Sequence, residues 1–297
     1  MLTIYNDDGT IDEKGNEELV DWYLANRVAG IFTVCLSSEM FALNPLERRK
    51  LATLSVNRVS GRIPVVACGG FGKTPAERVE DILRMADTGV TAVVLPISTM
   101  FPADAEDDEV TDGILAIIGQ CEGVDFGVYE CPQPYKRCLS PAMLKTLLDN
   151  TTRLVFSKDT CCDLRQLIAK AQVVSTHGLR LLNANLPTLL DSVEHGCAGY
   201  CGIAANVVPL ALVRMLECLT TEPEKARQMQ CLLNVLNPCL ECHYPRGAKD
   251  LLKMNGLAVT DFSRTSLDSC TVEELQRLQD FRNFVSLWKK RDFYFVS

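Results

Sequence analysis

Short, almost continuously apolar runs alternate along this chain with longer stretches of helical pattern. Because nearly every position within a run is apolar, rather than every second one, the runs are typical of parallel strands buried on both faces. Strands separated by single helices indicate repeated strand–helix–strand units. The seven runs are Val28–Leu36, Ile63–Cys68, Thr91–Leu95, Asp125–Glu130, Arg153–Lys158, Leu179–Leu182 and Ala198–Ile203.

The intervening stretches predict helices, several of which begin with proline or follow a Thr, Asn or Ser, as helix starts commonly do. The predicted helices are Asp12–Asn26, Pro45–Val59, Pro75–Thr88, Asp107–Gln120, Pro141–Leu148, Asp163–Ala171, Leu186–Glu194 and Pro209–Leu219. A further short run, Leu2–Tyr5, predicts an eighth strand. Eight such units favour a closed (β/α)8 barrel over a doubly wound sheet.

The pattern changes at Glu222, after which only helices are predicted, over Glu222–Leu236, Gly247–Met254 and Val272–Arg291. No low-complexity linker precedes them. We therefore expect a barrel over residues 1–221 and a C-terminal helical extension over 222–297 that packs on it.

Charge and composition exclude several classes of partner. The chain carries a net charge of −8, with a pI of about 5.1 and no basic run, which argues against binding to nucleic acid or to an anionic membrane. No apolar run approaches the ~20 residues of a membrane helix, and no export signal is visible. We expect a cytoplasmic protein whose 14 cysteines are reduced thiols.

One cysteine motif has two interpretations. Cys239, Cys242 and His243 offer three soft metal ligands, and their spacing matches a haem-attachment motif. No second Cys/His cluster lies nearby in the sequence to complete a tetrahedral site. The sequence therefore favours thiols packed in the helical tail, and we expect no bound metal.

The best candidates for chemistry stand at strand ends, because catalytic groups of a barrel lie at the carboxyl ends of its strands. Lys158 ends an apolar strand, where lost hydration disfavours the charged amine and so favours a nucleophile. The alternative is a structural lysine paired with Asp159 or Asp163. Tyr129 ends the preceding strand, within predicted reach of Lys158, and is either a proton shuttle or a packing residue.

Nearly end to end, the chain resembles the family of dihydrodipicolinate synthase and N-acetylneuraminate lyase. The resemblance is carried by Asp8–Asp12, Ser37–Glu39 with Leu43 and Glu47, Gly61–Val65, Val128–Pro132, Phe156–Asp159 and Asn206–Pro209. It implies a Schiff base on Lys158, with Tyr129 moving protons. It also implies that the carboxylate of a 2-oxo acid binds at Leu36, Ser37 and Ser38. A substrate contact at Ile203 and an acceptor-binding Arg137 belong to the same expectation.

The chain also departs from the family pattern. The family's Gly-Thr-Thr-Gly-Glu motif has Leu36 in place of one hydroxyl residue, and Ile97-Ser98 replaces a tyrosine pair. Arg137 is only an approximate counterpart of the arginine that binds the acceptor. The residues expected to bind the 2-oxo acid donor therefore follow the family pattern more closely than those expected to bind the acceptor.

These observations predict a Schiff-base-forming lyase, an aldolase or a related synthase or dehydratase. It would act on a 2-oxo acid, with pyruvate as donor or product and an aldehyde as partner. The imine acts as the electron sink, so no cofactor is required. The resemblance implies a homo-oligomer, a dimer or tetramer. The alternative is a non-catalytic 2-oxo acid-binding member of the same fold, which Leu36 and Ile97 favour.

Overall fold

The computed structural model describes residues 1–288, which form two compact units. The first unit comprises residues 29–202 together with Met1, and the second comprises residues 2–28 and the segment from 203 onward. The helices that follow residue 222 therefore share their unit with the helix at the start of the chain. The boundary expected at 221/222 stays a prediction.

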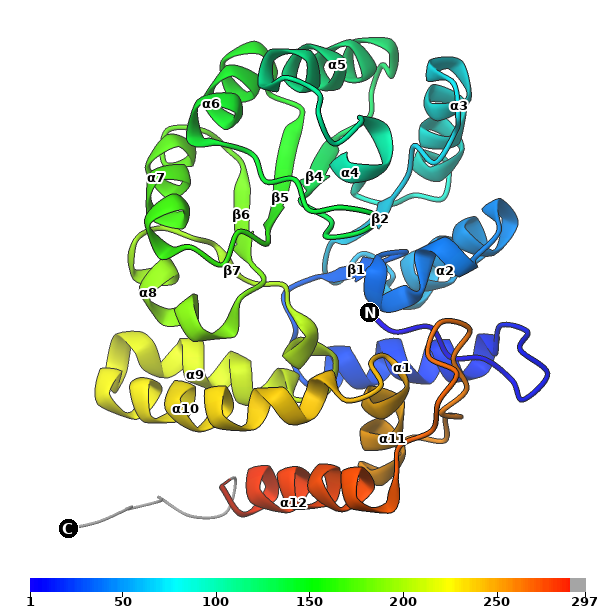
Figure 1. Ribbon diagram of the computed structural model, residues 1–297, viewed down its shortest axis with the longest axis vertical. Helices are drawn as coiled ribbons and strands as arrows, with labels where there is room; N and C mark the ends of the chain where they lie inside the picture. The colour runs from blue at the N-terminus through cyan, green and yellow to red at the C-terminus, as the bar shows by residue number, and fades with distance from the viewer. Residues whose placement is uncertain (289–297) are drawn as a thin grey trace. The chain divides into compact units, whose positions relative to one another are not determined.

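The first unit is built on a seven-stranded parallel sheet whose strands follow one another in sequence order, as Figure 1 shows. Each strand lies within one of the seven apolar runs or extends one residue past its end, so these predictions are confirmed. The strands are β1 (Ile31–Thr33), β2 (Val65–Cys68), β3 (Ala92–Pro96), β4 (Phe126–Tyr129), β5 (Leu154–Asp159), β6 (Arg180–Asn183) and β7 (Gly199–Tyr200).

Helices cover the outer face of this curled sheet (Figure 1). Their starts are set by local chemistry: the side chains of Asn44, Thr74, Ser140 and Asp163 each accept a hydrogen bond from a backbone N–H of the first turn. The helices are α2 (Pro45–Val59), α3 (Pro75–Ala86), α4 (Ile97–Met100), α5 (Asp107–Gln120), α6 (Pro141–Asn150), α7 (Leu164–Val174) and α8 (Leu189–Glu194). Short 3-10 turns stand at η1 (Leu36–Ser38), η2 (Met40–Ala42) and η3 (Leu186–Thr188).

The predicted eighth strand at Leu2–Tyr5 is wrong. Within residues 1–288 this segment forms only an isolated antiparallel bridge, between Tyr5 and Ile11. The side chain of Asn16 takes the place of a neighbouring strand: its Nδ2 donates to the carbonyl of Ile4 at 2.8 Å, and its Oδ1 accepts from the N–H of Ile4 at 3.1 Å. The main-chain groups of Ile4 are thereby satisfied without a strand partner.

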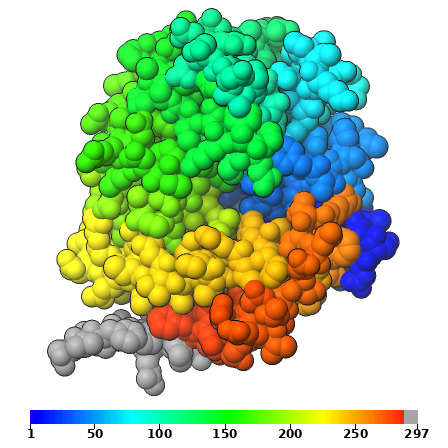
Figure 2. All heavy atoms as spheres, viewed as in Figure 1, coloured from blue at the N-terminus to red at the C-terminus, as the bar shows by residue number. Residues whose placement is uncertain are grey.

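The second unit is helical, as predicted for its C-terminal part. It contains α1 (Glu13–Ala25), η4 (Ile203–Asn206), α9 (Pro209–Thr221), α10 (Pro223–Leu236), η5 (Asn237–Glu241), α11 (Arg246–Met254) and α12 (Val272–Trp288). The last residues of the helix predicted to end at Arg291 lie outside the described part of the chain. Figure 2 shows the yellow α10 segment beside the orange α11 and red α12 segments. Over residues 1–288, no helix is both long and apolar enough to span a membrane.

Candidate active site

Lys158 and Tyr129 lie side by side at the ends of two adjacent parallel strands. They are direct register partners in the pairing of β4 with β5. The Nζ atom of Lys158 stands 4.6 Å from the centroid of the Tyr129 ring. Both side chains are buried, with 9% of Lys158 and 2% of Tyr129 exposed. The juxtaposition predicted from strand order is confirmed.

The rings of Phe32 and Tyr129 both lie close to the amine of Lys158. Phe32, at the centre of β1, places its ring centroid 5.7 Å from Nζ of Lys158 and packs edge-on against both Tyr129 and Phe156 at 5.6 Å. Ring faces at such distances stabilise a cation. Burial raises the pKa of the Tyr129 phenol, so this side chain is a neutral proton donor at neutral pH.

The structural alternative for Lys158, an ion pair with a neighbouring acid, is not what the structure shows. Asp159 pairs with Lys170 at 2.5 Å, and Asp163 caps α7 by accepting from the N–H groups of Arg165 and Gln166. Within residues 1–288, no carboxylate forms an ion pair with Lys158. A lysine that no carboxylate holds in an ion pair can reach a substrate carbonyl, as a nucleophilic lysine must.

A buried ionic triad stands directly behind the two strand ends. The Nζ of Lys170, on α7, contacts Glu130 Oε1 at 2.6 Å and Asp159 Oδ2 at 2.5 Å, and all three side chains are at most 1% exposed. Glu130 also accepts from the N–H groups of Leu139 and Thr160, each at 2.9 Å. Since Glu130 follows Tyr129 and Asp159 follows Lys158, the triad holds the ends of β4 and β5 together.

Burial and pairing act in opposite directions on the groups of the triad. Burial raises the pKa of Glu130, which the charge of Lys170 opposes. Burial disfavours the charge of Lys170, but the two carboxylates outweigh it and raise the pKa of its amine. The sequence analysis overlooked Lys170, although a signal was present: it falls among the buried positions of α7, with Leu167, Ala171 and Val174.

The turn after β1 holds the residues expected to bind the 2-oxo acid carboxylate. Ser37 lies within η1 and is 8% exposed. The hydroxyl of Ser38 instead organises the turn, since its Oγ accepts from the N–H of Cys35 at 3.1 Å and donates to the carbonyl of Met1 at 2.7 Å. Val34 has a φ of 48°, which is strained for a β-branched residue. Strained backbone of this kind gathers at functional sites.

The remaining predicted residues of the first unit lie in the loops after β1, β3 and β4. Leu36 begins η1 and is half-buried, and Ile97 is fully buried at the start of α4. The hydroxyl of Ser98 donates to the carbonyl of Gln133 at 2.6 Å. Arg137 is 12% exposed at its side chain and pairs with Asp107 at 2.8 Å. These roles stay predictions, with the guanidinium of Arg137 already engaged by a carboxylate.

Two features belong to the second unit. Ile203 stands at the start of η4, and its contact with substrate stays a prediction. Cys242, His243 and Glu274 form the one group of potential metal ligands found within residues 1–288. Cys239, which the sequence motif placed with them, is not a member of that group.

Comparisons of the whole chain with known proteins all lead to one family. Residues 1–282 match the model of the dihydrodipicolinate synthetase family. A 4-hydroxy-tetrahydrodipicolinate synthase of Methanococcus maripaludis is 25% identical over 213 residues, covering 71% of this chain and 70% of the relative. One from Thermomicrobium roseum is 26% identical over 224 residues, 74% of this chain and 71% of its own.

Solved structures show the same similarity of fold. The dihydrodipicolinate synthase of Thermotoga maritima superposes with a TM-score of 0.85 at 19% identity, covering 97% of each chain. A prophage protein of the dihydrodipicolinic acid synthase family from E. coli K12, solved in complex with pyruvate, gives a TM-score of 0.86 at 19% identity over 96% of each chain.

Proposed function

Because the chain belongs to the dihydrodipicolinate synthetase family and is an aldolase-type lyase of that family, we propose that it acts on a 2-oxo acid through an imine on Lys158. Pyruvate is the proposed donor or product. The observation that carries the proposal is the pairing of Lys158 with Tyr129 at adjacent strand ends, with no carboxylate of residues 1–288 neutralising the amine.

The chemistry begins at the neutral amine. The lone pair of Lys158 Nζ attacks C2 of the 2-oxo acid, and the carbonyl oxygen takes a proton to give a carbinolamine. Loss of water leaves an iminium, whose positive charge the rings of Tyr129 and Phe32 stabilise. Removal of a proton from C3 then gives an enamine. In the synthetic direction C3 attacks the aldehyde carbon, and the aldehyde oxygen takes a proton. Water finally hydrolyses the iminium and frees the product.

Tyr129 is the proposed proton carrier for these steps. Its phenol is neutral, buried and adjacent to the amine, so it can donate to the departing hydroxyl and then recover a proton. The iminium supplies the electron sink, so this chemistry requires neither a metal nor an organic cofactor at Lys158.

The carboxylate of the 2-oxo acid is proposed to bind at η1, through Ser37 and neighbouring backbone N–H groups. Leu36 replaces a hydroxyl there and makes the donor pocket more apolar. Arg137 is proposed to meet the acceptor aldehyde, in exchange for its contact with Asp107. We further propose that, over residues 1–288, the curled sheet of seven strands forms a barrel of the (β/α)8 type that lacks the regular eighth strand. We also propose that the protein is a cytoplasmic homo-oligomer, a dimer or tetramer.

Trapping of the imine tests the proposal. Incubation with pyruvate followed by borohydride should add one pyruvate-derived group per chain, and peptide mapping should place it on Lys158. Lys158→Ala should lose the adduct while remaining folded. Lys145→Ala is the matched control, because Lys145 is an exposed lysine of the same unit that pairs with Asp149. Ser37→Ala should weaken adduct formation without abolishing it.

Other 2-oxo acids belong in the same experiment, since Leu36 alters the donor pocket. The mechanism is wrong if no 2-oxo acid gives an adduct on Lys158. An adduct that never leads to cleavage or condensation with any tested aldehyde would instead identify a non-catalytic 2-oxo acid-binding protein.

A further inference from the structure

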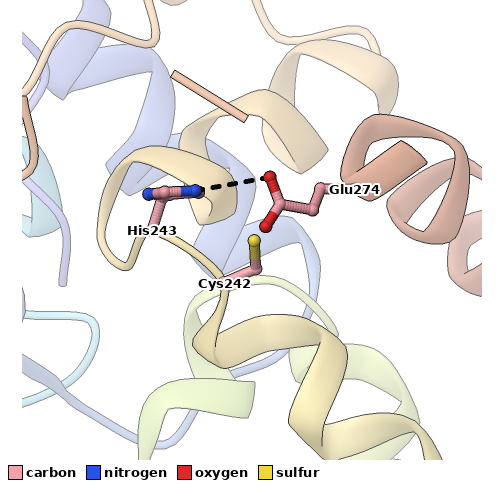
Figure 3. A group of neighbouring side chains, drawn as sticks. All are labelled: Cys242, His243 and Glu274. Carbon is pink, nitrogen blue, oxygen red and sulfur yellow. Dashed lines mark ion pairs between the residues drawn. The ribbon is translucent and has the colours of Figure 1, made fainter. Parts of the chain in front are cut away.

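A compact group of thiol, imidazole and carboxylate side chains lies within the second unit. Figure 3 shows Cys242, His243 and Glu274 converging on one point, with their ligand atoms all within 4.8 Å of one another. His243 Nε2 lies 3.3 Å from Glu274 Oε2. The thiol of Cys242 hydrogen-bonds to the same carboxylate.

A second thiol lies beside this group, although it does not belong to the set whose ligand atoms are all within 4.8 Å of one another. The side chain of Cys270 hydrogen-bonds to that of Cys242 and to that of Asp250, and Cys270 is only 9% exposed. We propose that Cys242, His243 and Glu274 bind one zinc ion, and that the thiol of Cys270 turns from Asp250 toward the ion to become the fourth ligand. None of the four has a part in the chemistry proposed at Lys158, so this inference is independent of the proposed function.

The distances between the ligand atoms of Cys242, His243 and Glu274 suit a tetrahedral zinc ion. Bonds of about 2.0–2.3 Å from zinc to nitrogen, oxygen and sulfur place neighbouring ligand atoms about 3.3–3.8 Å apart. The distance from His243 to Glu274 already matches, and the thiol of Cys242 needs to move by about 1 Å at most to join them. Two thiolates and an imidazole select zinc over magnesium or calcium, which prefer oxygen ligands.

The backbone holds the ligands in place without the ion. Glu274 accepts from the N–H and the hydroxyl of Thr271 at 2.8 and 2.9 Å, which fixes the carboxylate at the start of α12. His243 has a φ of 43°, in the left-handed region, and its carbonyl accepts from Ser266 and from the N–H of Gly247. A non-glycine residue held in this region indicates a local constraint.

Gly247 permits the close approach of the two thiol-bearing segments. A Cβ atom at this position would lie 2.3 Å from the carbonyl oxygen of Cys242 and 3.3 Å from Sγ of Cys270. The first turn of α11 therefore packs directly against the ligand-bearing turn. The proposed ion would join that turn to the start of α12 as a closed, structural site.

The sequence alone predicted no bound metal, because no second cluster of Cys or His lies near Cys239, Cys242 and His243 in the sequence. The fold adds Glu274 to the group and brings Cys270 beside Cys242, and this proposal replaces that expectation. Cys239 is left outside the group, which provides a matched control three residues away.

Metal content of the full-length protein tests the proposal. Protein without an affinity tag, produced in zinc-supplemented medium, should contain about one zinc per chain by elemental mass spectrometry. Cys242→Ser and Glu274→Gln should each lose most of it. Cys239→Ser should retain it, and so should Lys158→Ala. Zinc retained by Lys158→Ala separates this result from any outcome at the imine site.

A second measurement, the absorption of cobalt bound in place of zinc, tests the site on the wild-type protein and so does not depend on variants that fold poorly. Cobalt added to the metal-free wild-type protein should give the intense ultraviolet charge-transfer absorption of a thiolate–cobalt bond, and Cys270→Ser should reduce it. The proposal is overturned if the wild-type protein contains no zinc and gives no thiolate–cobalt absorption. Full zinc content in Cys242→Ser would also overturn it, as would a disulfide between Cys242 and Cys270 in the freshly purified protein.

Discussion

Replacement of Lys170 by methionine tests the role of the buried triad. Methionine is one atom shorter than lysine and uncharged, so the variant nearly fills the same space and leaves Glu130 and Asp159 buried without their shared cation. Removing one partner from a buried ion pair costs about 3–5 kcal/mol of unfolding free energy. The upper part of that range applies here, because two carboxylates lose their partner and no side chain of the triad is more than 1% exposed.

The free energy of unfolding measures the effect of the change, and an exposed ion pair of the same unit provides the control. Urea unfolding followed by circular dichroism should show the midpoint of Lys170→Met well below that of the wild-type protein. Lys145→Met removes an exposed ion pair with Asp149, in which the side chains are 62% and 45% exposed. That control should leave the urea midpoint close to that of the wild-type protein, because an exposed ion pair is screened by solvent.

The loss of unfolding free energy in Lys170→Met, which we call its deficit, should change with pH in one direction. Burial already raises the pKa of Glu130, and Lys170 opposes the rise, so the variant raises the pKa of Glu130 further. A carboxyl whose folded-state pKa exceeds its unfolded value, about 4.3, destabilises the fold as the pH rises through that interval. The deficit should therefore be largest near neutral pH and shrink as the pH falls toward about 5.

A second variant separates charge from packing. The triple change Lys170→Met, Glu130→Gln and Asp159→Asn leaves no unpaired charge and should recover part of the lost stability. The reasoning is refuted if Lys170→Met costs no more than Lys145→Met. It is also refuted if the deficit grows, rather than shrinks, as the pH is lowered.

Two further predictions concern catalysis. Tyr129→Phe should lower the turnover of an identified substrate by about 10²-fold or more, because a general acid–base group contributes 10²–10⁴; Tyr23→Phe, which removes another buried hydroxyl, bonded at 3.1 Å to Asn206, is the control. An unchanged rate would make Tyr129 a packing residue. Ile97-Ser98 in place of a tyrosine pair, together with the engagement of Arg137 by Asp107, predicts little synthesis of dihydrodipicolinate from pyruvate and aspartate semialdehyde. A coupled assay that gives a turnover of order 10 per second, typical of an enzyme on its own substrate, would show that these replacements are tolerated.

The sequence by itself determined the strands of the first unit. Continuous apolar runs identify buried parallel strands because both faces of such strands are shielded from water, and the order of the runs along the chain became the order of strands in the sheet. That order is enough to bring Tyr129 and Lys158 together, since side chains at the ends of neighbouring parallel strands lie at one edge.

Only the tertiary structure decided which polar groups meet across elements. Leu2–Tyr5 has the composition of a strand, yet Asn16 satisfies the main chain of Ile4. Lys170 is an isolated lysine in its helix until α7 packs behind β4 and β5. Glu274 joins Cys242 and His243 although about thirty residues separate them. Periodicity records which face of an element is buried, whereas the partner of a buried charge or thiol depends on contacts between segments that no local pattern encodes.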